Sequence, residues 1–113
     1  MKGSEKQVAW AMSKISALKV KNDARLAREQ RRYDDDLRDG VADPSRLACV
    51  RDIHDATARG LETLERIGNA SQIIDYGVNV AGFIGQNLIE AHGEWIKTHF
   101  KSASEFVKWA AGI

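Results

Sequence analysis

The sequence has 113 residues, of which 43% are hydrophobic and 29% are charged, with a formal net charge of +1 and one cysteine. This length and composition predict a single domain with a modest core, and the near-neutral charge argues against a general nucleic-acid binder. The lone Cys49 excludes an internal disulfide, and no apolar run is long enough to span a bilayer. Because too few residues precede the first predicted helix for a signal peptide, we expect a soluble, cytoplasmic protein with one domain over residues 1–113.

The first predicted helix runs from Ser4 to about Arg38. Ser4 and Gln7 form the Ser-x-x-Gln pattern of a capping box. Trp10 lies at the margin of the apolar face, where it is either a shoulder residue covering the edge of the core or an exposed aromatic anchor for a partner. Apolar residues recur at three and four positions, as on the buried face of a helix: Val8, Ala11, Met12, Ile15 and Leu18.

The second half of this helix is highly charged. From Lys19 to Arg32 six residues are basic and two are acidic, and acids then dominate from Asp34 to Asp39. With so few apolar residues, this half is predicted to project from the bundle. We expect it to be held by exposed ion pairs worth about 0.2–0.5 kcal/mol each: Arg25 with Glu29, Arg31 with Asp35, Arg32 with Asp36, and Asp34 with Arg38.

A second helix is predicted to begin at Asp43 and Pro44, which suit the cap and the first helical position. Gly68 would end it and Asn69 would cap the next helix, although a helix that continues through this junction is the alternative. The apolar face of the second helix is carried by Val50, Ile53, Leu61, Leu64 and Ile67.

The third predicted segment, from Gln72 to about Phe100, is the most apolar part of the chain and can bend or break at Gly93. Ser102 would cap a short last helix. Since almost nothing in the sequence favours a strand, the predicted fold class is all-α, a small bundle of three to four helices with a long charged first helix. Three glycines thin the surface of the third segment, so that another helix can approach closely: Gly77, Gly82 and Gly85.

No constellation of catalytic or metal-ligating residues is evident. Cys49 and the three histidines lack the spacing of zinc ligands. Asp34, Asp35 and Asp36 are adjacent, and adjacent residues on a helix point in different directions. We therefore expect no enzymatic activity, no cofactor and no metal, and we interpret Cys49 as a packed, unreactive thiol.

The arginines of the first helix are the best candidates for a binding surface. Arg25, Arg28 and Arg32 share one helical face, and their forked donors suit carboxylates or phosphates. Such a stripe is either a solvated face laced with ion pairs, a nucleic-acid site or a contact for another protein. The neighbouring acids would repel a duplex, so a protein partner is favoured over nucleic acid. The predicted partner-binding residues are Trp10, Arg25, Arg28, Arg31, Arg32, Asp34, Asp35 and Asp36.

The opening stretch GSEKQVAWAMSKI, residues 3–15, resembles the start of small uncharacterised helical proteins of phages and mobile elements, which begin Gly-Ser-Glu-Lys-Gln-x-x-Trp-Ala. NASQIIDYG, residues 69–77, is similar to their motif Ser-x-Trp-Trp-Ile-Asp, with Ser71, Ile74 and Asp75 in place but no aromatic pair. The resemblance covers residues 3–18 well and 69–76 loosely. It implies a setting in a bacterial host cell.

That setting favours a non-enzymatic module that binds a host protein or protein complex, with an anti-CRISPR-like inhibitor of a defence complex as the specific form. The alternative is a small nucleic-acid-binding or regulatory protein that uses the basic stripe. Three tryptophans, the glycine-thinned third segment and a first helix with few apolar partners also favour a homodimer.

Overall fold

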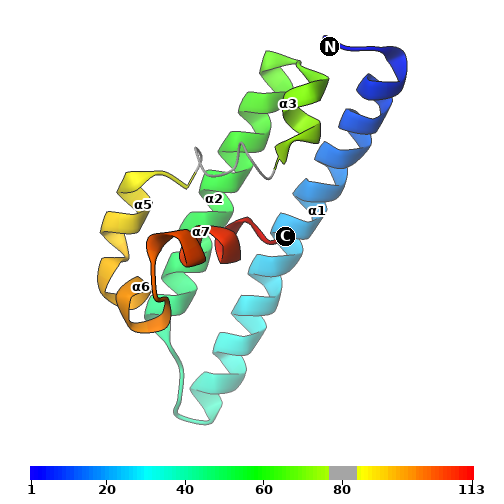
Figure 1. The fold of residues 1–113 in the computed structure, drawn as a ribbon. Coiled ribbons are helices and arrows are strands. Elements are labelled where there is room, and N and C mark those ends of the chain that lie inside the picture. Colours follow the sequence, from blue (N-terminus) through cyan, green and yellow to red (C-terminus); the bar gives the residue numbers. More distant parts are fainter. Residues whose placement is uncertain (77–83) are drawn as a thin grey trace.

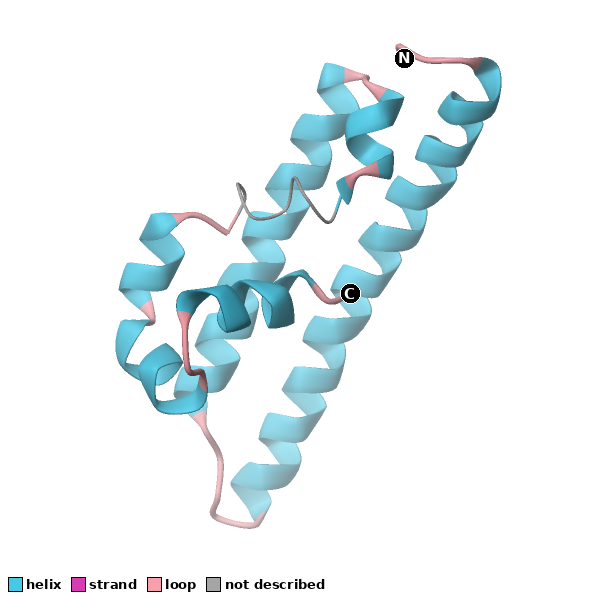
Figure 2. Cartoon of the chain, in the orientation of Figure 1, coloured by secondary structure: helices cyan, strands magenta, loops and turns pink. Residues whose placement is uncertain are grey.

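The chain forms an antiparallel pair of long helices against which shorter helices pack (Figure 1). The structure is a computed structural model that describes residues 1–76 and 84–113. Within these ranges there is no strand, and the predicted all-α class is confirmed (Figure 2). The helices are α1 (Glu5–Arg38), α2 (Pro44–Ile67), α3 (Ala70–Ile74), α5 (Gln86–Ala91), α6 (Gly93–His99) and α7 (Ala103–Ala111).

The predicted helix ends form as expected. The Ser4 hydroxyl accepts from the Gln7 amide while the Gln7 side chain accepts from the Ser4 amide, which completes the capping box. Asp43 caps α2, with Pro44 at its first position. Gly68 ends α2 in the left-handed region at φ 67°, a conformation that glycine adopts without steric cost. The alternative of a helix continuous through this junction is therefore wrong.

The N-terminus is joined to the turn between α2 and α3. The Lys2 amide donates to the Gly68 carbonyl, and the Ala70 amide donates to the Lys2 carbonyl. Further along, the Lys14 ammonium donates to the Ile74 carbonyl at the end of α3. The two segments that carry the sequence resemblance, residues 3–18 and 69–76, consequently lie side by side.

The core lies between the long helices and the shorter ones. Met12, which is 56% exposed, was expected in it but lies outside, because the buried face of α1 is narrow. Ile67, 58% exposed, is also outside, since it occupies the last residue of α2. The buried apolar side chains include Ala11, Ile15 and Leu18 of α1, Ile53, Leu61 and Leu64 of α2, Trp95 and Ile96 of α6, and Phe106 and Ala110 of α7.

The third segment is not one helix. Helix α3 ends at Ile74, α5 begins at Gln86, and a new helix begins at Gly93, where a break was predicted. Gly85 precedes α5 as its cap. Gly77 and Gly82 lie outside the described residues, so their predicted role in close packing stays a prediction.

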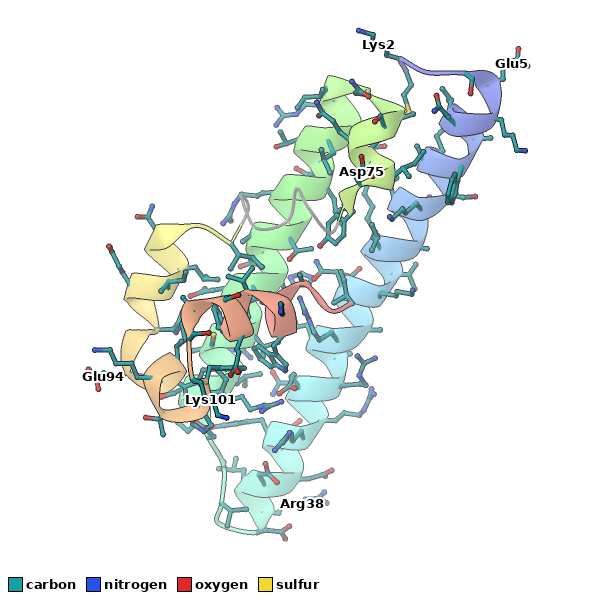
Figure 3. The ribbon with its side chains drawn as sticks, in the orientation of Figure 1. Lys2, Glu5, Arg38, Asp75, Glu94 and Lys101 are labelled. Carbon is teal, nitrogen blue, oxygen red and sulfur yellow. The ribbon has the colours of Figure 1, made fainter. Side chains whose placement is uncertain are left out.

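The expectation that the charged half of α1 projects from the bundle is wrong, because polar contacts replace the missing apolar ones. Arg46 of α2 donates to both oxygens of Glu29, at 2.8 and 2.9 Å, and its guanidinium lies 5.5 Å from the ring centroid of Trp109. Arg51 donates to the Gln30 side chain at 2.7 Å. Figure 3 shows Arg38 at the far end of this half, beside the turn to α2.

His54 joins the two long helices through carboxylates on both sides of its ring. Nε2 lies 2.7 Å from an oxygen of Asp23 on α1, and Nδ1 lies 3.0 Å from an oxygen of Asp55. Both nitrogens can donate only in the imidazolium form. Burial of the ring lowers the pKa of His54, but the hydrogen bonds to the two carboxylates outweigh it, so that the pKa is raised overall.

A pH-dependent stability follows from this raised pKa. The contribution of His54 is fully present below the ordinary histidine value of about 6.5 and is lost as the pH rises through the raised folded-state pKa. We expect His54→Gln to cost about 1 kcal/mol at pH 5.5, because both carboxylates are largely exposed and solvent weakens their attraction, and less at pH 8.5. Chemical denaturation at both pH values measures this, and an equal cost at both would contradict it.

Candidate partner-binding surface

Arg25 does not belong to an exposed stripe. Its Nη1 donates to the carbonyl of Ala110 at the end of α7, at 2.6 Å, and the rest of the guanidinium is closed off from solvent. Burial lowers its pKa, with only partial compensation from nearby groups. The predicted pair with Glu29 is also absent, because both oxygens of that carboxylate bind Arg46. The prediction that Arg25 lines the outer face is therefore wrong.

The acids at the end of α1 pair differently from the expected pattern. Of the predicted pairs, Arg32 with Asp36 is formed, at 3.7 Å. Asp35 accepts from Arg38 instead of Arg31. Asp34 accepts from the Gln30 side chain at 3.2 Å instead of pairing with Arg38. Arg28 and Arg31 are left exposed, with no ion pair or hydrogen bond to any described residue.

Helix geometry places these free arginines and Trp10 on one face. Trp10 and Arg28 are 18 residues apart, which is five full turns of an uninterrupted helix and about 27 Å. Trp10 is 61% exposed, which leaves its ring accessible to a partner. We call this surface the free face of α1: Lys6, Trp10, Lys21, Arg28, Arg31 and Arg32, all exposed.

The free face carries charge of one sign over most of its length. It spans about 39 Å from Lys6 to Arg32, and the acids of α1 within this span, Asp23 and Glu29, lie on other sides of the helix. Asp35, three residues after Arg32, is the first acid on this side of the helix beyond the free face. The outer face of α2 differs, because its charges alternate in sign at three- and four-residue spacing, so that no stretch of it carries one sign: Arg51, Asp55, Arg59, Glu62 and Arg66.

A pocket of about 270 Å³ lies between the end of α1 and the start of α2. Asp36 and Arg32 line one side, and Asp43 and Arg46 line the other. Asp43 is committed to the fold, since it caps α2 and accepts from Trp95 Nε1 at 3.0 Å. Although burial opposes it, these hydrogen bonds lower the pKa of Asp43. Most charges around this pocket therefore hold helices together.

The remaining chemically reactive side chains are also structural. Burial raises the pKa of the Cys49 thiol to about 12, which agrees with the interpretation of a packed, unreactive residue. His92 Nε2 lies 2.6 Å from a carboxylate oxygen of Asp52 on α2. Within residues 1–76 and 84–113, no group of three His, Cys, Asp or Glu side chains could hold a metal ion.

A buried polar cluster escaped the sequence analysis. Asn22 and Thr57 are 1% and 0% exposed, and Tyr76 is 4% exposed. Together with Arg25 they contain five buried atoms that have no hydrogen-bond partner among the described residues. Each such atom costs about 1–3 kcal/mol, so five would cancel the 5–15 kcal/mol that stabilises a whole domain. The position of Asn22 could have indicated this cluster, because it places a polar amide four residues after Leu18, on the buried face of α1.

The chain was compared with models of protein families, with curated protein sequences and with solved structures, and no match was found in any of them. Among the described helices, none combines the length and the apolar character needed to cross a membrane. The candidate site therefore depends on the geometry of α1 itself.

Proposed function

We propose that this chain is a protein-binding module that acts without catalysis and contacts its partner through the free face of α1. The observation that carries the proposal is the combination of an exposed Trp10 with the unpaired Arg28 and Arg31 on one uninterrupted helix. Tryptophan and arginine are the residue types enriched at binding hot spots. Arg28 and Arg31 make no ion pair or hydrogen bond with a described residue that would give them a role in the fold.

The partner we propose is a host protein or protein complex, in the setting that the sequence resemblance implies. Inhibition of a host defence complex, as by an anti-CRISPR protein, is the specific form of this proposal. The resemblance itself is supported by the adjacency of its two segments, since residues 3–18 and 69–76 then form one structural unit. The step to inhibition rests on analogy with proteins of such settings.

A protein surface is favoured over nucleic acid as the partner because the charge is local. The net charge of +1 gives little long-range attraction to a polyanion. Asp34 and Asp35 are exposed at the end of the free face, where a duplex backbone would meet them. A protein surface that is acidic opposite the arginines and basic opposite Asp34 and Asp35 can instead match the change of sign at this end.

Nucleic-acid binding is the second candidate, favoured by the length of the free face with its unpaired cations. Electrophoretic mobility shifts with double-stranded DNA at 50 and 200 mM salt separate the two. Binding that falls by several orders of magnitude between these concentrations would support the nucleic-acid function, since each displaced counterion steepens the salt dependence. For the protein-binding function we expect no shift at either salt concentration.

The direct test of the protein-binding function is affinity capture from a bacterial lysate followed by mass spectrometry. We expect a specific host protein that the wild-type chain retains and that a variant with Trp10, Arg28 and Arg31 replaced by alanine loses. Retention by both would contradict a role for the free face.

We also propose that the chain forms a homodimer. Seven large hydrophobic side chains are exposed among the described residues, including Met12, Val20 and Leu37, and symmetric contact between two copies would cover some of them. Light scattering at micromolar concentrations should return twice the 12.6 kDa mass of one chain. The mass of one chain across this range would refute the dimer.

A further inference from the structure

The buried polar cluster has the features of a ligand-binding site. Asn22 and Arg25 lie one turn apart on α1, Thr57 comes from the middle of α2, and Tyr76 follows α3. Two contacts to the chain are made: Asn22 Nδ2 donates to the carbonyl of His54 at 3.0 Å, and Arg25 Nη1 donates to that of Ala110 at 2.6 Å. The other polar atoms of the cluster are buried without a partner among the described residues: Asn22 Oδ1, Arg25 Nε and Nη2, Thr57 Oγ1 and the Tyr76 hydroxyl.

Asn22 ties this part of α1 to α2 near Thr57, through its hydrogen bond to the carbonyl of His54. Burial raises the pKa of the Tyr76 hydroxyl, while a hydrogen-bonding contact with Thr57 and the positive charge of Arg25 lower it. The contact between the two hydroxyls does not reach the geometry of a full hydrogen bond, so each hydroxyl can still donate to another acceptor.

The unused edge of Arg25 is suited to an anion. Nε and Nη2 form the side of the guanidinium that presents two parallel N–H groups. Arg46 uses this same edge to hold the carboxylate of Glu29, at 2.8 and 2.9 Å. The equivalent edge of Arg25 is buried and unpaired. Arg46 therefore has a carboxylate bound at this edge of its guanidinium, whereas Arg25 has no acceptor there among the described residues.

The balance of donors and acceptors favours an anion over water. The cluster offers four donors, namely two N–H groups of Arg25 and the hydroxyls of Thr57 and Tyr76, against one obligate acceptor, Asn22 Oδ1. A water molecule must donate as well as accept, whereas an anion only accepts. No carboxylate neutralises Arg25 either, since Glu29 binds Arg46 and residues 77–83 contain no acid.

We propose that this cluster binds one small monovalent anion, held by the Nε and Nη2 edge of Arg25 and by the hydroxyls of Thr57 and Tyr76. The ligand class is a compact anion, of the size of chloride or formate, because the polar atoms are closed off from solvent. The anion neutralises Arg25 and thereby strengthens the link from α1 to the end of α7, which Arg25 makes through Ala110.

Thermal unfolding of the full chain in different sodium salts at equal ionic strength tests the site. We expect the melting temperature to rise by several degrees between about 1 and 100 mM chloride or formate, because a ligand bound only to the folded state stabilises it by mass action. Gluconate, whose carboxylate is attached to a chain too large for the site, should not raise it. Equal melting temperatures in all three salts would overturn the proposal and leave water as the occupant.

Variants localise the effect. Arg25→Gln, Thr57→Val and Tyr76→Phe should each reduce the response to chloride and formate, while Arg31→Gln, the same change at an exposed position of α1, should keep it in full. A full response in all three cluster variants would place any bound anion elsewhere and overturn the assignment. If Arg25→Gln fails to fold, wild-type crystals grown in bromide should show an anomalous peak beside Arg25, and no peak there would overturn the proposal.

Discussion

Phe106→Ala is expected to lower the free energy of unfolding by about 3–5 kcal/mol, the range for removing a buried aromatic side chain. Phe106 is 0% exposed and is among the largest of the fully buried side chains. Its ring lies 5.5 Å from that of Phe100 and 6.2 Å from that of Trp109, measured between centroids. These rings join α7 to the end of α6, so the truncation leaves a cavity at that junction. Urea denaturation followed by circular dichroism measures the loss.

Val107→Ala on the same helix is the matched control. Val107 is only half-buried, so we expect it to cost about 1 kcal/mol or less. Similar costs for both variants would mean that the aromatic cluster does not anchor α7 as described. Unfolding of the Phe106 variant in two separate transitions would instead indicate that α6 and α7 detach before the long helices separate.

The helices could be predicted from the sequence wherever local chemistry determines them. Ser4, Asp43 and Gly68 mark helix ends by their own hydrogen bonds or backbone conformation, and each was placed correctly. The third segment could not be predicted in the same way. Its apolar residues fit a long helix, but α3 ends at Ile74, and periodicity does not report where packing against other helices ends a helix.

The candidate site was predicted in part, because helical spacing gives the face of a residue but not the partner it selects. Arg28 and Arg32 are exposed as predicted, whereas Arg25 is not, and the role of the stripe in binding stays a prediction. Arg25 turns inward to a carbonyl 85 residues away in the chain, and such a contact leaves no pattern in the local sequence. The sequence analysis did not place Trp10 and Arg28 on the same face of the helix, although their separation of 18 residues, or five turns, is enough to predict it.

Replacing Lys21, Arg28 and Arg31 together with alanine is expected to weaken capture of the protein partner at least tenfold. All three are exposed, and none makes an ion pair or hydrogen bond with a described residue, so the stability should change by no more than about 0.5 kcal/mol per site. Truncating an arginine that becomes buried at an interface costs about 2–5 kcal/mol of binding, whereas a rim charge alters mainly the association rate. Surface plasmon resonance with the captured partner gives both the affinity and the rates.

The control for this prediction is a triple alanine variant at Arg51, Arg59 and Arg66, which removes three positive charges from the outer face of α2. We expect it to bind as wild type does, because Asp55 and Glu62 lie between those arginines and leave that face without a continuous stretch of positive charge. If both triple variants lose affinity to the same extent, net charge rather than the free face determines binding. If neither loses affinity, the free face is a solvated surface, and Trp10→Ala then tests whether the aromatic anchor acts alone. A tenfold loss confined to the α1 variant, with an unchanged melting temperature and a faster dissociation rate, would place Lys21, Arg28 and Arg31 within the buried part of the interface.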